Sequence, residues 1–206
     1  FILTSCSKKY PDFSQLNYKL SRLYGARLDS SAEKYGDWQL LKMTVSVIND
    51  RYSLDGESLA NRACDMPLGL IFEPSTENGA FLENDVSREK RKAIEHIKGE
   101  ISEKRILAKN RLIEEMYKDE PYGVPKCGTV EDVEKITGSS LYTAWQKMLK
   151  TAFIRVNVVG SSVPSGFFER ISENFALLDR KDITLPKISA PTKENKTVSK
   201  VTDRMD

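Results

Sequence analysis

The chain has 206 residues, of which 39% are hydrophobic and 30% charged, enough for one domain with a substantial core. Its 32 basic and 30 acidic groups leave a net charge of +2, and the two signs are interleaved along the sequence. This balance provides no basic stripe for phosphate groups, so we expect no nucleic-acid partner. No apolar run approaches the length of about 18 residues that spans a bilayer, so we expect no membrane partner.

The cysteine and histidine usage restricts the metal and disulfide chemistry open to the chain. Cys6, Cys64 and Cys127 lie far apart without a Cys-x-x-Cys pair, and their odd number argues against a disulfide framework. With His96 as the single histidine, a structural zinc site of the usual Cys/His spacing cannot be assembled. This usage favours a reducing, cytoplasmic location. The chain opens on Phe1 and soon turns polar, which we interpret as the tail of an element that begins upstream.

The first third of the chain alternates helical and extended patterns. Apolar residues spaced by three and four predict a helix over residues 12–23. Residues 26–34 and 37–48 are separated by a Tyr-Gly-Asp turn, and the second segment is rich in β-forming residues, so a hairpin is the simplest pairing. Residues 58–72 predict another helix, which Pro67 should kink or end because proline lacks an N–H and crowds the preceding turn.

Residues 85–117 predict the longest helix of the chain. Apolar residues recur there at intervals of three, four and seven along a stretch without proline. Asp85 is the expected N-cap. Gly99 is the weak point, since glycine costs about 1 kcal/mol relative to alanine in a helix, so a kink or break is expected there. His96 lies near the middle, and a lone histidine on a charged helix is ordinarily a solvated side chain.

A connector and two helices are predicted after the long helix. Residues 118–128 contain two prolines and two glycines, a composition typical of a loop. Thr129 fits a capping box at the start of a short helix. Ser139 or Ser140 is then the expected cap of a helix that ends near Lys150.

The last part of the chain completes an α+β pattern. Residues 152–159 alternate as a half-buried strand, and residues 164–178 return to a helical spacing. We therefore predict an α+β fold, a mixed or antiparallel β-sheet with helices packed on one face, in a single domain of residues 1–185. Residues 186–206 are rich in Lys, Thr, Ser and Pro, which predicts a polar linker.

Three stretches, matching in order and spacing over roughly residues 2–160, resemble the pitrilysin/insulinase metallopeptidases, which include the mitochondrial processing peptidases. These stretches are LYGARLDS at 23–30, a Phe…Glu-Lys…Glu-Ile pattern at 81–101, and PYGVPKCGTVEDVEKIT at 121–137 with Leu-Tyr at 141–142 and Val-Val-Gly at 158–160. The resemblance implies that the N-terminal strand and the motif helix of the family domain are truncated here. It also implies that the polar linker leads toward a second, homologous domain.

In active members of this family a His-x-x-Glu-His helix supplies two zinc ligands and a general base, and a glutamate on a later helix is the third ligand. Position by position, Phe1 falls where the last histidine of the motif would be, and this chain contains no His-x-x-Glu-His. Glu89 matches a family glutamate, and seven residues further on the ligand position is His96. A slip of one residue would place Glu95 there without changing Phe1. The resemblance therefore implies no catalytic residues and no metal ligands, and we expect no cofactor, zinc belonging to the active relatives.

The favoured hypothesis is a non-catalytic domain of a pitrilysin/insulinase-like peptidase. Inactive halves in this family pair with an active subunit or half to enclose a chamber that holds a peptide or unfolded polypeptide. Such peptides bind by adding a strand to a sheet edge. The edge that the resemblance implies here comprises Leu28, Asp29, Ser30, Ser31 and Ala32.

Three alternatives stay open at the level of sequence. An active zinc peptidase would carry its His-x-x-Glu-His motif upstream of residue 1 and use Glu95 or Glu100 as its third ligand. A binding or scaffold domain unrelated to proteolysis is compatible with the interleaved charges of the long helix. Cysteine-nucleophile chemistry is the most remote, because His96 is the single histidine that could act as its base.

Overall fold

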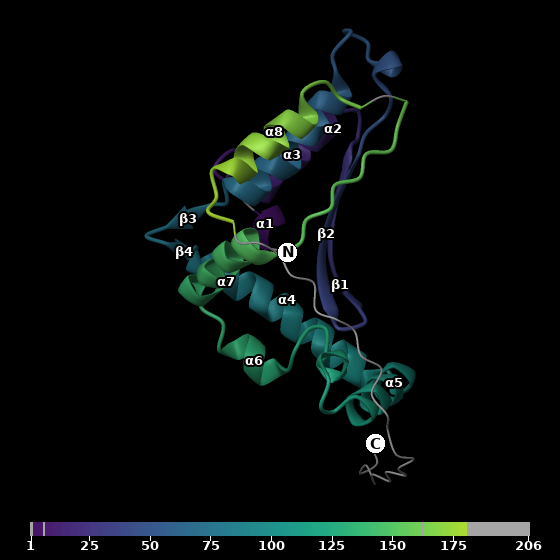
Figure 1. Cartoon of the computed structure of the whole chain (residues 1–206), viewed down its shortest axis with the longest axis vertical. Helices are drawn as coiled ribbons and strands as arrows, with labels where there is room; N and C mark the ends of the chain where they lie inside the picture. The colour runs from purple at the N-terminus through teal and green to yellow at the C-terminus, as the bar shows by residue number, and fades with distance from the viewer. Residues whose placement is uncertain (1, 6, 162, 181–206) are drawn as a thin grey trace.

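The computed structural model describes residues 2–5, 7–161 and 163–180. In Figure 1 a group of helices lies on one side and a long β-hairpin stands on the other. The elements in chain order are α1 (Ile2–Ser5), α2 (Phe13–Arg22), β1 (Arg27–Tyr35), β2 (Trp38–Ser46), the 3₁₀ turn η1 (Asp50–Tyr52), α3 (Leu59–Phe72), β3 (Thr76–Glu77), β4 (Ala80–Phe81), α4 (Glu83–Ser102), α5 (Lys104–Met116), η2 (Pro121–Gly123), α6 (Val130–Glu134), α7 (Gly138–Thr151) and α8 (Phe167–Ala176).

The predicted hairpin is confirmed. β1 and β2 pair antiparallel in one unbroken register, from Arg27 opposite Ser46 to Tyr35 opposite Trp38. Gly36 in the two-residue loop has a φ of 55°, a conformation that glycine adopts without a steric cost. A second, very short sheet of β3 and β4 was not predicted, because two-residue strands leave no periodicity to detect.

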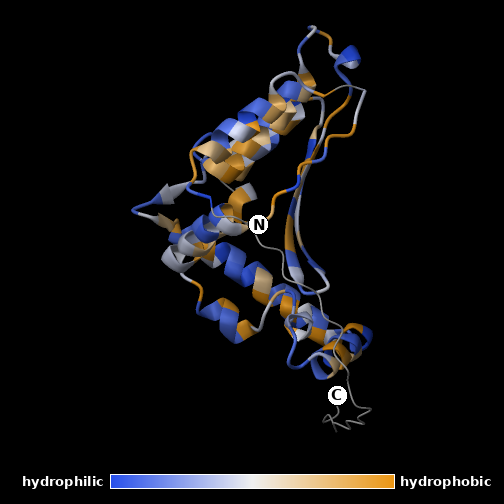
Figure 2. Ribbon diagram, in the orientation of Figure 1, coloured by the Kyte–Doolittle hydropathy of each residue, from blue (hydrophilic) through white to orange (hydrophobic). Residues whose placement is uncertain are grey.

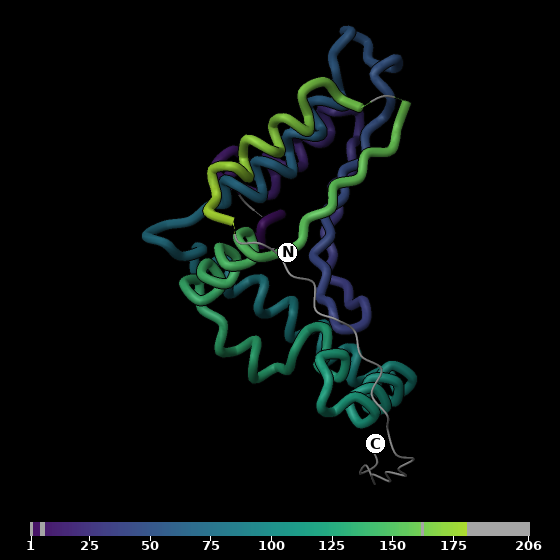
Figure 3. The backbone as a smooth tube through the Cα atoms, in the orientation of Figure 1, coloured from purple at the N-terminus to yellow at the C-terminus, as the bar shows by residue number. Residues whose placement is uncertain are grey.

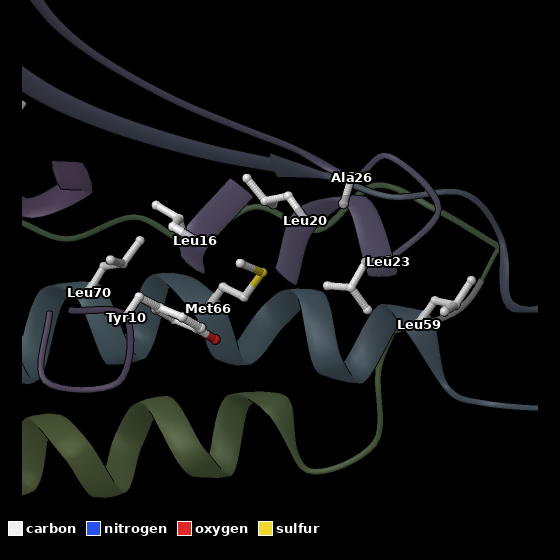
Figure 4. Packing of buried hydrophobic residues seen from close by; sticks show 8 residues of the cluster. All are labelled: Tyr10, Leu16, Leu20, Leu23, Ala26, Leu59, Met66 and Leu70. Atoms are coloured by element: carbon white, nitrogen blue, oxygen red, sulfur yellow. The ribbon is translucent and has the colours of Figure 1, made fainter. Parts of the chain in front are cut away.

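One core cluster joins the hairpin to α2 and α3. Leu28, Met43 and Val47 of the hairpin segment pack against this cluster, which places the helices on one face of the β1–β2 sheet. Figure 4 shows its eight buried members, which are Tyr10, Leu16, Leu20, Leu23, Ala26, Leu59, Met66 and Leu70. The predicted α+β class, with helices on one sheet face, is therefore confirmed.

A second cluster joins α1, β4, α4 and α7. Its buried members are Ile2, Leu3, Phe81, Val86, Trp145 and Leu149. Gly138, the first residue of α7, lies so close to β4 that a Cβ atom there would stand 2.3 Å from the carbonyl oxygen of Phe81. The rings of Phe81 and Trp145 meet edge to face with centroids 6.2 Å apart. The absence of a side chain at Gly138 thus permits the close packing on which this cluster depends.

The prediction of one long helix over residues 85–117 is wrong in one respect, because this stretch forms two helices, α4 and α5. The break falls at Glu103, which takes an extended conformation (φ −89°, ψ 105°), whereas Gly99 stays inside α4. The hydroxyl of Ser102 donates to the carbonyl oxygen of Lys98 at 2.9 Å, a local bond that competes with the helical pattern where α4 ends. Asp85 is not the N-cap: α4 starts at Glu83, so Asp85 is the third residue of the helix.

Pro67 neither ends nor interrupts α3, which continues to Phe72. Proline inside a helix costs about 3 kcal/mol through the missing hydrogen bond and the crowded turn. Four residues of α3 on both sides of it are buried, namely Leu59, Ala63, Met66 and Leu70. Burial of a large apolar side chain contributes about 1.5–3 kcal/mol, so packing of this face outweighs the local cost.

The predicted cap of α6 is confirmed, and that of α7 lies slightly earlier than expected. Thr129 and Asp132 form a capping box at the start of α6. At α7 the cap is Thr137, and Ser140 is its reciprocal partner, so neither Ser139 nor Ser140 is the cap itself. Both helices start on a threonine whose hydroxyl accepts from the amide three residues on, which is the pattern that marks a helix start in sequence.

The strand predicted for residues 152–159 is wrong, since this stretch pairs with no other strand in the part of the chain that the structure describes. Figure 3 shows it as a drawn-out segment that leads from the end of α7 up toward α8. The helix predicted over 164–178 is shorter, starting at Phe167 after Gly166, whose φ is 65°. The predicted linker 186–206 lies outside the described residues.

Candidate functional site

His96 is a largely exposed side chain on α4. Its Nε2 atom lies 3.3 Å from a carboxylate oxygen of Glu100, one turn further along the helix, and its side chain is 56% exposed. Glu95 points into solvent, 70% exposed, with the Arg91 guanidinium 4.0 Å away. Neither side chain is enclosed, so this part of α4 presents a solvated surface.

Glu89 lies two turns before His96 and is mostly covered, its side chain being 15% exposed. Its carboxylate accepts from Lys92 Nζ at 2.8 Å, and Arg88 Nε lies 3.7 Å away. Arg88 also donates to Asp85 at 2.6 Å. Seven residues bring Glu89 and His96 to the same side of α4, yet the carboxylate is engaged with cations and the imidazole is exposed.

The described residues do not fit a zinc site of the kind that the resemblance implies for active members. A single histidine, with Glu100 beside it, provides too few ligands for a tetrahedral metal. Within residues 2–5, 7–161 and 163–180, no group of three or more His, Cys, Asp or Glu side chains is arranged to hold a metal ion. Phe1, the other position that the resemblance assigns to a ligand, lies outside the described residues.

The outer edge of β1 carries the residues predicted to bind a peptide. β1 pairs with β2 on one side only, and no further strand joins it among the residues that the structure describes. Ser30 and Ala32 lie on the same sheet face as Leu28, which packs against the helices, while Asp29 and Ser31 lie on the opposite face. The hydroxyls of Ser30 and Thr4 of α1 lie 3.4 Å apart.

Lys34 fixes the tip of the hairpin, a role that the sequence did not reveal. Its ammonium group donates to the carbonyl oxygens of Pro121 at 2.8 Å and Tyr122 at 2.9 Å, and also to that of Val124. Burial lowers the pKa of Lys34, and the nearby Asp37 carboxylate opposes that effect. A lysine within a β pattern is normally read as exposed, so sequence reasoning missed this anchor.

Gln39, which lies directly opposite Lys34 in the hairpin, makes a second contact with the same connector. Its side-chain amide donates to the carbonyl oxygen of Lys126 at 3.1 Å. The hairpin tip is thus attached to the Pro- and Gly-rich segment within the third family-like stretch. These hydrogen bonds of Lys34 and Gln39 fix the orientation of the hairpin, and therefore of the edge of β1, relative to the connector.

The described cysteines lack the environment of nucleophiles. Burial raises the pKa of Cys64, with a further rise from the Asp65 carboxylate. Burial also raises the pKa of Cys127, which Lys126 partly opposes. A raised pKa keeps the thiol protonated and weakly nucleophilic, which argues against cysteine chemistry at these two positions. Cys6 lies outside the described residues.

No family model matches the chain, but comparison with individual proteins and solved structures gives clear likenesses. The "Probable inactive metalloprotease YmfF" of Bacillus subtilis (strain 168) is 28% identical over 159 residues, or 77% of this chain. A conserved protein from Enterococcus faecalis V583 superimposes with a TM-score of 0.68 at 26% identity over 73% of this chain. A peptidase M16 inactive domain from Pseudomonas fluorescens superimposes with a TM-score of 0.61 at 19% identity over 93% of this chain.

The chain spans 37% of the length of the Bacillus relative, and 35% and 42% of the two solved chains. The chain has an α+β fold, which is similar to that of the peptidase M16 inactive domain. The Bacillus relative is named a probable inactive metalloprotease and the Pseudomonas structure an inactive peptidase domain, and these likenesses confirm the resemblance to inactive pitrilysin-type metallopeptidases that was seen in the sequence. These likenesses argue against a scaffold domain unrelated to peptidases. No described helix is long and apolar enough to cross a membrane.

Proposed function

We propose that this chain is a non-catalytic domain that helps an active subunit or half of the same family to form a peptide-binding chamber. The observation that carries the proposal is the outer edge of β1, which no described strand pairs with and which presents small side chains at Ser30 and Ala32. An extended peptide added there gains backbone hydrogen bonds, which supply affinity largely independent of its sequence. The ligand is accordingly an extended peptide or an unfolded polypeptide.

Two features of α4 support the non-catalytic part of the proposal. His96, at the position that the resemblance assigns to the ligand glutamate of the family, is exposed beside Glu100, and Glu89 is held by Lys92 and Arg88. One imidazole without partner ligands and supporting hydrogen bonds does not keep a metal in place. We further propose residues 1–185 as one domain and 186–206 as a linker toward a second homologous domain. A reducing cytoplasm suits the free thiols of Cys64 and Cys127.

Site-specific photo-crosslinking tests the proposed edge. A photoreactive amino acid is placed at Asp29 or at Thr44, its direct cross-strand neighbour on β2, and a fluorescein-labelled unstructured peptide is added. The two sites lie on the same sheet face and differ in the strand on which they stand. We expect strong peptide labelling from position 29 and little from position 44. Equal labelling, or a preference for position 44, contradicts the assignment of the peptide to β1.

The role of the partner requires a separate measurement. Peptide hydrolysis by an active subunit of the family is measured alone and after addition of this chain within its full protein. We expect addition to raise the rate, because a second wall restricts the escape of bound peptide. No change in rate at saturating chain concentration, together with no complex in size-exclusion chromatography, contradicts the chamber.

A further inference from the structure

The outward face of α5 carries large apolar side chains. In Figure 1 this helix lies away from α2, α3 and α8, and none of its residues, all of which the structure describes, is buried. Leu112 is 59% exposed, and Met116, one turn further on, is 48% exposed. Ala108, one turn before Leu112, is exposed as well. Residues four apart lie on one side of a helix, so these three form a short apolar row that faces solvent.

The charges of α5 are segregated along its length, and Figure 2 shows its hydrophobic and hydrophilic residues side by side. Its basic residues all fall in the first part of the helix and are Lys104, Arg105, Lys109 and Arg111. Its acidic residues stand together near the end and are Glu114 and Glu115. The start of a helix carries a partial positive charge and its end a partial negative charge, so this order is the reverse of the one that stabilises an isolated helix. The stability of α5 by itself therefore does not account for the order of its charges.

An antiparallel neighbour of the same sequence does account for this order. Two α5 helices related by a twofold axis place the basic half of each beside the acidic half of the other, and their dipoles oppose one another. With the axis at the level of Asn110, residues equally far before and after that position face each other. Ala108 then faces Leu112 of the second copy, and Arg105 faces Glu115 of the second copy. These four positions follow one another at intervals of three, four and three, which puts them on one side of the helix.

We propose that the outward face of α5 is a docking surface for a second copy of this chain, with the two α5 helices packed antiparallel about a twofold axis. Ala108 and Leu112 form the apolar centre, and Arg105 and Glu115 form an ion pair at each end. The symmetry makes every contact twice. A contact of one helix from each copy belongs to the small and weak class of protein interfaces, so its dissociation constant lies above about 1 μM. This surface is separate from the edge of β1, so the inference does not depend on peptide binding there.

Sedimentation equilibrium of the full protein at increasing concentration tests the proposal. We expect a reversible equilibrium between monomer and dimer. Leu112→Glu should raise the dissociation constant by about tenfold or more, because it brings two like charges together in the apolar centre. Leu54→Glu is the matched control, since this leucine is 87% exposed in the loop between η1 and α3, and it should leave the constant unchanged. A monomer at every concentration up to about 1 mM overturns the proposal, and so does a dimer that Leu112→Glu leaves intact.

Charge reversal gives a second measurement that does not involve the apolar centre. Arg105→Glu and Glu115→Arg each place like charges opposite one another across the twofold axis, so each should weaken the dimer by about tenfold. In the double variant opposite charges face one another again, and the dissociation constant should return to within about threefold of the parent value. If the double variant is instead weakened by the product of the two single effects, these residues do not meet across an interface and the inference fails.

Discussion

Lys34 is the residue on which attachment of the hairpin tip depends. Its ammonium group donates to three carbonyl oxygens of the connector, those of Pro121, Tyr122 and Val124. In Lys34→Met these carbonyls lose their donor, and we expect the free energy of unfolding to fall by about 1–3 kcal/mol. Urea denaturation followed by circular dichroism measures the change. Lys42→Met, on the exposed part of the same hairpin, is the control and should stay within about 0.5 kcal/mol.

The lowered pKa of Lys34 predicts that the stability of the folded chain depends on pH. Because burial lowers the pKa of Lys34 in the folded chain below its unfolded value of 10.5, the unfolded chain binds more protons in the window between these two values. Stability contributed by a group with this shift rises with pH through that window. The stability of the parent chain relative to Lys34→Met should therefore increase from neutral pH to pH 10.5. A difference that decreases over this range would show that the ammonium group is not desolvated.

Alanine substitutions at two glycines, Gly138 and Gly99, are expected to change the stability of the chain in opposite directions. In Gly138→Ala the new Cβ would stand 2.3 Å from the carbonyl oxygen of Phe81, so α7 must move away from β4. We expect a loss of about 1–3 kcal/mol, as for an overpacked core. In Gly99→Ala no atom lies within 4 Å of the new Cβ, and the helix should gain about 1 kcal/mol. Thermal unfolding of both variants and of the parent chain measures whether each substitution raises or lowers stability. A stabilised Gly138→Ala would contradict the close packing of α7 against β4.

At the scale of elements, the break between α4 and α5 has a direct test. Glu103 is extended, and Lys104 is the first residue of α5, a position that tolerates proline because its N–H has no helical partner. We expect Lys104→Pro to leave helix content and stability nearly unchanged. Arg91→Pro, in the middle of α4, should cost about 3 kcal/mol. If both prolines were equally destructive, residues 83–116 would be one continuous helix.

The hairpin and the helices of the first core were predictable because their patterns act locally. The alternation along β2 predicts a strand, the Tyr-Gly-Asp sequence predicts a turn, and the spacing of Leu16 and Leu20 predicts a helix. The observed pairing and packing agree with all three predictions. The continuation of α3 through Pro67 was not predictable, because it depends on burial by residues distant in sequence. Residues 153–159 show the reverse case, in which a clear strand pattern lacks a described partner to pair with.

The candidate site was predictable only through its family likeness. No periodicity distinguishes Glu89 or His96 from other charged helix residues, and the interpretation of His96 rests on a register within the family pattern. The structure adds what the pattern lacks, namely that His96 is exposed and that Lys92 holds Glu89. The anchoring role of Lys34 left no trace in the sequence, because its partners are backbone carbonyls that any residue provides.

At the scale of the whole molecule, the hairpin is fixed at two separate places. Leu28, Met43 and Val47 secure its base to the core of α2 and α3. Lys34 and Gln39 secure its tip to the connector after α5. The stretch of β1 between these anchors is where the proposed peptide would be accommodated.

Zinc content separates the non-catalytic proposal from an active peptidase with its motif elsewhere in the protein. We expect the full protein, purified and dialysed without chelator, to retain far less than one zinc per molecule by elemental mass spectrometry. His96→Glu, which places a glutamate at the position that the resemblance assigns to a zinc ligand, should not change that content, because one carboxylate on an exposed part of α4 lacks the other ligands of a tetrahedral site. One tightly held zinc in the parent protein would contradict the non-catalytic proposal. Zinc that appears only in His96→Glu would instead show that the remaining ligands are intact and that a single substitution abolished metal binding.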